Sequence, residues 1–210
     1  MPFTRSNSVQ NFIDNLLSLL ENQRTLLCKN EFDMEPLFTG LKSPRRPNDA
    51  TPKGSLPALK NLDDAIQNGW SGPTLIHELM HSFLNISNEL SWYRRKEPDL
   101  SDFMQGHANA FIIGPNGLEE RGKDVLVGVS LLAPKVSYPD HRHPPEELYI
   151  VMSEGEWRQN DAPWHSPGIG GFVHNPSNII HSMRAKSKPL LAIWCLWQQP
   201  EPDQPRPQSS

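Results

Sequence analysis

The chain has 210 residues and a formal net charge of −4 at pH 7, a length that suits one substantial domain with an extension. The mild charge and the absence of a basic stripe interleaved with aromatic residues argue against a nucleic-acid partner. Two cysteines and no apolar run of membrane-spanning length argue against a disulfide framework and a membrane partner, and the first residues lack a secretory-signal layout, so we expect a cytoplasmic protein.

The first half of the chain carries helical patterns. Apolar residues recur three and four positions apart over residues 9–29, which predicts an amphipathic helix. Residues 36–57 are rich in proline and predict a loop. Two further helical patterns follow at residues 56–68 and 73–90, the second with Pro73 in its first turn.

The last of these helical segments contains HELMH at residues 77–81, which has the His-Glu-x-x-His form of zinc metallopeptidases. On a helix both imidazoles would share a face, and Glu78 could activate a metal-bound water. Such enzymes need a third protein ligand, but Leu84 and Ser87 occupy the places of the glycine and histidine of the extended motif. A metallopeptidase stays an alternative to a plain helix whose histidines lie at the edge of a buried apolar face.

From residue 107 onward the chain consists of short β-type runs separated by Gly, Pro, Asn and Asp. The runs are 107–113, 125–133, 148–153, 171–174, 179–184 and 190–197. Helices followed by regularly spaced strands predict a mainly β fold, a single small antiparallel β-barrel or jelly roll with an N-terminal α-helical extension. We expect residues 1–104 to form the helical region on the barrel, 105–197 the barrel, and 198–210 a disordered tail.

Four residues of the barrel region have the character of metal ligands. On one strand His141 and His143 would point to the same face, and Glu147 follows after a Pro-Pro turn. His181 belongs to a later strand. Three imidazoles and a carboxylate suit zinc, and iron, manganese and nickel accept the same set. The sequence therefore predicts one divalent transition-metal ion inside the barrel, with zinc preferred, although histidines in a polar loop are usually solvated.

This pattern resembles the two motifs of the cupin superfamily. The first motif is matched by His141, His143, Glu147 and Gly155, and the second by Gly170, Pro176 and His181. Lys135 stands where an opening glycine is usual, and Asn178 and Ala185 replace a glycine and an asparagine of the second motif. Because Asn178 can adopt the left-handed conformation that a turn requires, these departures affect turns and leave the ligand set complete.

A narrower likeness covers about residues 138–197. The stretch YPDHRHPPEELY at 138–149, HSMR at 181–184 and the apolar run 189–197 resemble the cupin-type dimethylsulfoniopropionate lyases, bacterial enzymes that cleave this sulfonium zwitterion to dimethyl sulfide and acrylate. The resemblance implies a carbon–sulfur lyase with Tyr149 as the catalytic base and Tyr138 as a further active-site tyrosine. By the same likeness, the metal ligands are His141, His143, Glu147 and His181.

The residue types agree with this chemistry. In a β-elimination a proton leaves the carbon next to the carboxylate, and a divalent cation that binds the carboxylate acts as a Lewis acid. Free tyrosine has a pKa of about 10, so Tyr149 needs a nearby cation that stabilises its phenolate; without the resemblance, an ordinary inward-facing aromatic residue is the simpler interpretation. The sulfonium suits aromatic faces, and Trp194 and Trp197 are candidates, although their spacing lets only one line a cavity.

Other functions stay open at this point. The same ligand set hosts other metallocupin enzymes, such as iron dioxygenases and sugar isomerases. A non-catalytic small-molecule-binding cupin would need neither Tyr149 nor an open metal position. A small-molecule substrate is the expected partner of the leading hypothesis, and the sequence leaves open whether the chain forms a homodimer.

Overall fold

The computed structural model describes residues 3–27, 33–48, 56–97, 100–120 and 125–198. Its helices are α1 Asn7–Leu27, α2 Glu35–Lys42, the 3-10 helix η2 Pro57–Asn61, α3 Leu62–Gly69, α4 Thr74–Ser87 and α5 Ser101–Gly106. Its strands are β1 His107–Ile113, β2 Val125–Leu132, β3 Ser137–His141, β4 Glu146–Val151, β5 Glu156–Gln159, β6 Phe172–Asn175, β7 His181–Arg184 and β8 Leu190–Trp197. Cys28 and the predicted disordered tail after Gln198 lie outside the described residues.

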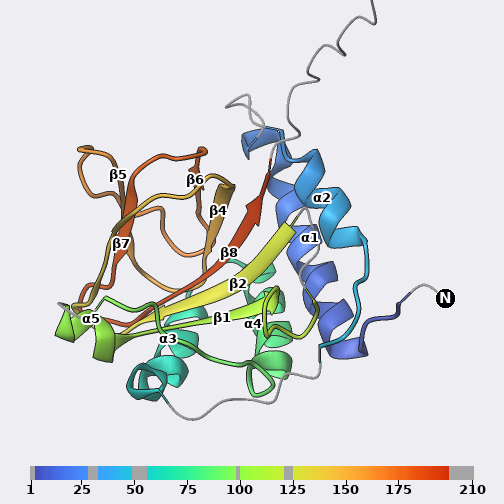
Figure 1. The fold of residues 1–210 in the computed structure, drawn as a ribbon, viewed down its shortest axis with the longest axis horizontal. Coiled ribbons are helices and arrows are strands. Elements are labelled where there is room, and N and C mark those ends of the chain that lie inside the picture. The colour runs from blue at the N-terminus through green and yellow to red at the C-terminus, as the bar shows by residue number, and fades with distance from the viewer. Residues whose placement is uncertain (1–2, 28–32, 49–55, 98–99, 121–124, 199–210) are drawn as a thin grey trace, which may run out of the picture.

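The strands form two antiparallel sheets. The larger has the order β1-β2-β8-β4-β6 and the smaller the order β3-β7-β5. Figure 1 shows the small sheet on one side and the long strands β1, β2 and β8 crossing the centre of the molecule, with helices on their far side. The predicted mainly β architecture with an N-terminal helical region is confirmed. The domain boundary near residue 104 stays a proposal.

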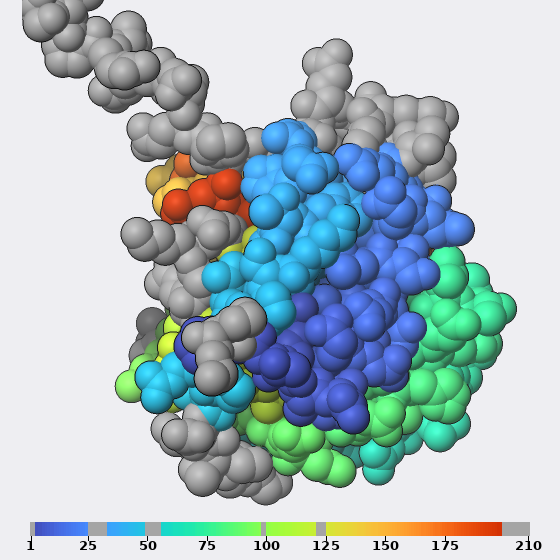
Figure 2. Space-filling view, turned by 90° about the vertical axis from the view of Figure 1, so that its right-hand side faces the viewer, coloured from blue at the N-terminus to red at the C-terminus, as the bar shows by residue number. Residues whose placement is uncertain are grey.

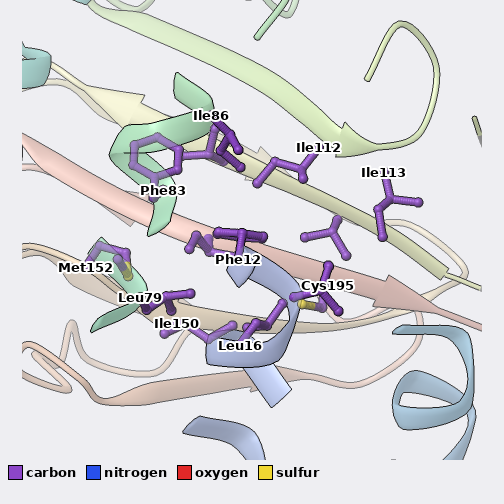
Figure 3. Close-up of a cluster of buried hydrophobic side chains, with 14 of the residues drawn as sticks. Phe12, Leu16, Leu79, Phe83, Ile86, Ile112, Ile113, Ile150, Met152 and Cys195 are labelled. Carbon is purple, nitrogen blue, oxygen red and sulfur yellow. The ribbon is translucent and has the colours of Figure 1, made fainter. Parts of the chain in front are cut away.

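Helices cover the outer face of the five-stranded sheet. Figure 2 shows α1 and α2 side by side on this surface, with α4 beside the lower part of α1. The side chains beneath them form one core, in which Phe12 and Leu16 of α1 meet Leu79 of α4 and Ile150 of β4 (Figure 3). None of the described helices combines the length and apolar character needed to cross a membrane.

Alternation along the strands of the large sheet separates two cores. In β8, Cys195 and Trp197 belong to the core beneath the helices, whereas Trp194 belongs to a second core between the two sheets. In β4, Ile150 faces the helices and Tyr149 faces the second core. Because side chains alternate with a period of two, each strand contributes one set of residues to the helical core and one to the barrel interior.

The structure differs from the sequence-based prediction in the region expected to be a loop. Helix α2 lies there, with Pro36 in its first turn, where proline is tolerated because no backbone donor is lost. Leu37, Phe38 and Leu41 of this helix are buried. Helix α5 was also absent from the prediction.

Two of the eight strands were not predicted, β3 and β5. Strand β3 is an edge strand that contains Pro139, and its pairing with β7 is irregular between Tyr138 and His141. The strand ends at His141 and His143 lies in the following turn, so the two histidines do not share one strand, the condition under which a period of two would place them on one face.

Two positions where the cupin motifs carry glycine have left-handed backbone conformations here. Asn178 has φ 60° and Lys135 has φ 65°. The expectation that Asn178 supplies the left-handed turn is confirmed. Its backbone N–H donates to the His143 carbonyl oxygen over 2.9 Å, which connects the turn before β7 to the turn after β3.

Candidate functional site

A cavity of about 170 Å³ lies between the two sheets. Its volume is below the roughly 300–1,000 Å³ typical of pockets for drug-sized ligands, so it suits a smaller molecule. Its lining includes both polar and aromatic side chains. The cavity is lined by Tyr93, Asn109, Phe111, Leu126, Ser130, Tyr138, His141, His143, Glu147, Tyr149, Trp194 and Leu196.

Three histidines converge beside this cavity, and two of them, His141 and His143, line it. His141 ends β3, His143 follows it in the turn, and His181 begins β7, directly opposite His141 in the sheet. One ring nitrogen of each lies within 4.8 Å of one ring nitrogen of the other two. Glu147 of β4 lies beside them, with Oε2 at 3.0 Å from His181 Nε2 and 3.6 Å from His143 Nε2. The four residues predicted as ligands are therefore brought together from both sheets.

The three imidazoles are oriented in the same way. Each Nδ1 lies within hydrogen-bonding distance of a backbone carbonyl two residues away, at 2.9–3.0 Å. These bonds suit Nδ1–H tautomers, which leave the Nε2 lone pairs free. In His181 this Nε2 is buried and makes no hydrogen bond among the described residues. Imidazoles that bind a metal commonly donate their other N–H to a carbonyl or carboxylate in this manner, so the arrangement fits a divalent cation.

The charge states of the cluster also fit a cation. Burial and the neighbouring His181 lower the pKa of His141 to about 4, so this ring is neutral at neutral pH and can act as a ligand. Burial alone would raise the pKa of the Glu147 carboxyl, but His143 and His181 outweigh it and hold that pKa below its ordinary value. Burial opposes protonation of His143, yet the Glu147 carboxylate raises its pKa. An anionic carboxylate surrounded by imidazoles favours a bound positive charge.

The two tyrosines predicted in the active site both line the cavity. Tyr149 is 3% exposed, and burial together with the Glu147 carboxylate raises its pKa. Burial also raises the pKa of Tyr138. The Tyr138 hydroxyl accepts a hydrogen bond from Asn109 Nδ2 over 3.3 Å, and Ser130 Oγ donates to Asn109 Oδ1 over 2.8 Å. This network leaves the Tyr138 proton available to a group inside the cavity.

Aromatic rings form the wall beside Tyr149. Trp194 lies opposite Tyr149 in the β4–β8 pairing and makes an edge contact with Phe111, and Phe111 stacks on Tyr93. Trp197, also predicted to contact substrate, does not line the cavity. It is buried in the core beneath the helices, because a residue three positions along a strand projects from the opposite face.

Gly128 makes room for this wall. It pairs with Trp194 in the sheet, and a Cβ atom at Gly128 would lie 2.1 Å from the indole and 2.6 Å from the Ala110 carbonyl oxygen. Because the second contact is with backbone, the strands would have to shift. We expect Gly128→Ala to destabilise the protein by about 1–3 kcal/mol, the usual effect of overpacking, as measured by urea unfolding. An unchanged unfolding midpoint would contradict this account of the wall.

Sequence reasoning missed several cavity residues. Asn109 and Ser130 are polar residues within apolar runs, and a period-two reading places Asn109 on the same strand face as Phe111. That signal could have identified them. Tyr93 lies outside any regular pattern and joins the site only through an isolated antiparallel bridge to Asn109.

The HELMH pattern lies on α4, away from the cavity. The Trp70 ring contacts both imidazoles, with centroid distances of 5.5 Å to His77 and 4.6 Å to His81. Within the described part of the chain, no further His, Cys or carboxylate completes a three-ligand group with this pair. The geometry therefore does not support the metallopeptidase alternative.

Comparisons with known proteins all indicate the same enzyme family. A family model for dimethylsulfoniopropionate lyase matches residues 33–192. A protein of Cereibacter sphaeroides named putative dimethylsulfoniopropionate lyase DddL is 31% identical over 137 residues, which are 64% of this chain and 55% of that protein. The dimethylsulfoniopropionate lyase DddQ of Ruegeria pomeroyi is 32% identical over 100 residues, 47% of this chain and 48% of that protein.

A solved structure shares the fold. The crystal structure of DddQ from Ruegeria pomeroyi matches with a TM-score of 0.63 and 22% identity, over 94% of this chain and 99% of that chain. In the sequence comparisons, by contrast, the chain spans about half the length of the curated relatives it matches.

Proposed function

The chain belongs to the dimethylsulfoniopropionate lyase family, and from this we propose that it is a carbon–sulfur lyase that cleaves dimethylsulfoniopropionate to dimethyl sulfide and acrylate. The observation that carries the proposal is a three-histidine cluster beside Glu147, of which His141, His143 and Glu147 line one small cavity together with Tyr149. The cavity's size suits this small zwitterion. Its polar and aromatic walls offer separate surfaces for a carboxylate and a sulfonium.

We propose that His141, His143, His181 and Glu147 hold one divalent cation. Zinc is the preferred ion for three imidazoles and a carboxylate, and iron, manganese and nickel are accepted by the same set. When bound, the cation would supply positive charge that neutralises the substrate carboxylate and stabilises a phenolate nearby. The carbonyl oxygen beside each histidine Nδ1 supports this assignment, because it favours the tautomer in which Nε2 is free to bind a cation.

Tyr149 acts as the general base in this proposal. Its oxygen takes the proton from the carbon next to the carboxylate, and the electron pair of that C–H bond forms the new C=C bond. The C–S bond breaks, and the sulfur leaves with its electron pair as neutral dimethyl sulfide. Burial supports the role, because water has little access to the Tyr149 side chain and cannot compete for the proton.

The remaining walls orient the substrate. Tyr138, whose oxygen already accepts the Asn109 amide, donates its own proton to the substrate carboxylate. The sulfonium lies against Trp194 and Phe111, since a cation without N–H or O–H donors is best held by aromatic faces. The carboxylate and the sulfonium of the zwitterion therefore bind different side chains, and Trp194, which pairs with Tyr149 in the sheet, brings the carbon between them near Tyr149.

Headspace detection of dimethyl sulfide tests the proposed activity. The purified chain, incubated with dimethylsulfoniopropionate, is expected to release dimethyl sulfide and acrylate in equal amounts. Prior removal of metal with a chelator should abolish the release, and added Zn²⁺, Fe²⁺ or Mn²⁺ should restore it. No dimethyl sulfide from folded, metal-loaded protein would contradict the proposed substrate, and chelator-resistant release would contradict the metal requirement.

A further inference from the structure

Two amides connect strand β5 to the Glu147 carboxylate. Gln159 Nε2 donates to Asn175 Oδ1 over 2.8 Å, and Asn175 Nδ2 donates to Glu147 Oε2 over 2.8 Å. Asn175 is completely buried. A buried amide is costly unless its hydrogen bonds are satisfied, and here both ends of the Asn175 amide have partners.

The order of donors and acceptors fixes the direction of the Asn175 amide. The ionised Glu147 carboxylate can only accept, so Asn175 must present Nδ2 to it and Oδ1 to the other side. Gln159 enforces this orientation, because its Nε2 donates both to Asn175 Oδ1 and, over 2.5 Å, to the His174 carbonyl oxygen. A flipped Asn175 would place its own donor against the Gln159 donor.

The carboxylate oxygen held in this way is the one that faces the histidines. Glu147 Oε2 accepts from Asn175 and also lies 3.0 Å from His181 Nε2. In the sheets, Asn175 lies directly opposite Glu147, and Gln159 lies directly opposite His181. The two amides therefore connect the large sheet, at the position of Glu147, to the small sheet, at the position of His181.

We propose that Asn175 and Gln159 are positioning residues of the metal centre, which fix the rotation of the Glu147 carboxylate so that Oε2 stays directed at the imidazoles. This inference rests on the proposed function of the cluster as a metal site. Neither amide lines the cavity, so both act through Glu147 and not on the substrate. Asn175 acts directly, and Gln159 acts through Asn175.

The test is the Zn²⁺ affinity of the metal-free chain, measured by competition with a chromophoric chelator. Asn175→Leu, of similar size but without the amide, is expected to weaken Zn²⁺ binding by about 10–100-fold. Gln159→Met should weaken it less, because Asn175 can still donate. The double variant should bind Zn²⁺ as Asn175→Leu does, since the effect of Gln159 requires Asn175.

Ser153→Ala is the matched control. Ser153 is also buried, and its hydroxyl donates to the Pro189 carbonyl oxygen over 3.0 Å and accepts from the Leu191 N–H over 2.7 Å. Its replacement should lower the unfolding temperature and leave the Zn²⁺ affinity unchanged. A merely structural role for Asn175 would make its variant behave like this control.

The inference is overturned if Asn175→Leu binds Zn²⁺ within about twofold of the parent, or if the two substitutions act additively. Should Asn175→Leu fail to fold, the variant of the half-buried Gln159 is measured in its place. An unchanged Zn²⁺ affinity of Gln159→Met then overturns the inference. A parent that binds no Zn²⁺ would overturn both this inference and the proposed metal centre. A parent that binds Zn²⁺ and releases dimethyl sulfide, with unaffected variants, would overturn the inference alone.

Discussion

Tyr149→Phe is expected to lower kcat for dimethyl sulfide release by about 10²–10⁴-fold, the usual contribution of a general base. The substitution removes one oxygen and keeps the ring that lies opposite Trp194. The metal content should stay at the parent level, because neither the histidines nor Glu147 is changed. Steady-state kinetics by headspace analysis and metal analysis of the same preparation check both expectations.

The chain contains three tyrosines, all of which line the cavity, so it offers its own controls. Tyr93→Phe should retain activity within a few-fold, since the phenyl ring can still stack on Phe111. Tyr138→Phe should raise KM more than it lowers kcat, because it removes the proposed donor to the substrate carboxylate and leaves the proposed base, Tyr149, in place. If kcat of Tyr149→Phe were as high as kcat of Tyr93→Phe, the assignment of Tyr149 as the base would be wrong.

His181→Ala is expected to remove the metal ion and the activity together. His181 Nε2 is buried beside Glu147 Oε2, and its loss leaves a gap between the two sheets that water would fill. We expect the metal per chain after dialysis to fall to background and dimethyl sulfide release to fall with it. Elemental analysis and the headspace assay measure the two quantities on one sample.

His77→Ala separates this account from the peptidase alternative. His77 lies on α4 against Trp70 and does not line the cavity, so its variant should keep the parent's metal content and activity. The opposite result, metal lost from His77→Ala and retained in His181→Ala, would move the metal site to the helix. A loss in both variants would contradict a single site at the barrel.

The strands whose bounds the sequence predicted are those with long apolar runs. Strands β1 and β8 are nearly continuous runs of buried residues, and both were predicted with the bounds that the structure has. Strand β5 was missed because Glu156 and Arg158 pair with charged residues of β7 and β3, so their polarity masks the strand. Proline explains the missed elements α2 and β3, as Pro36 and Pro139 occupy a helix start and an edge strand, where proline is tolerated.

The site was predictable where chemistry and spacing act within a short stretch. His141, His143, Glu147 and Tyr149 fall within nine residues, and the types of the first three suggested a metal, whereas the role of Tyr149 as a base came from the family resemblance. The supporting residues are not marked by their types, and only the alternation along a strand could have pointed to Asn109 and Ser130. Asn109, Ser130 and Asn175 are common polar types whose roles depend on strand register, and a one-residue change in register would turn each away from the site.

Anomalous diffraction from crystals grown with Zn²⁺ tests the central claim most directly. We expect one zinc peak bonded to the Nε2 atoms of the three histidines and to a Glu147 oxygen, at bond lengths of about 2.0–2.2 Å. The Tyr149 oxygen should face the same ion across the cavity. A peak at the α4 histidines, or no peak between the two sheets, would contradict the account.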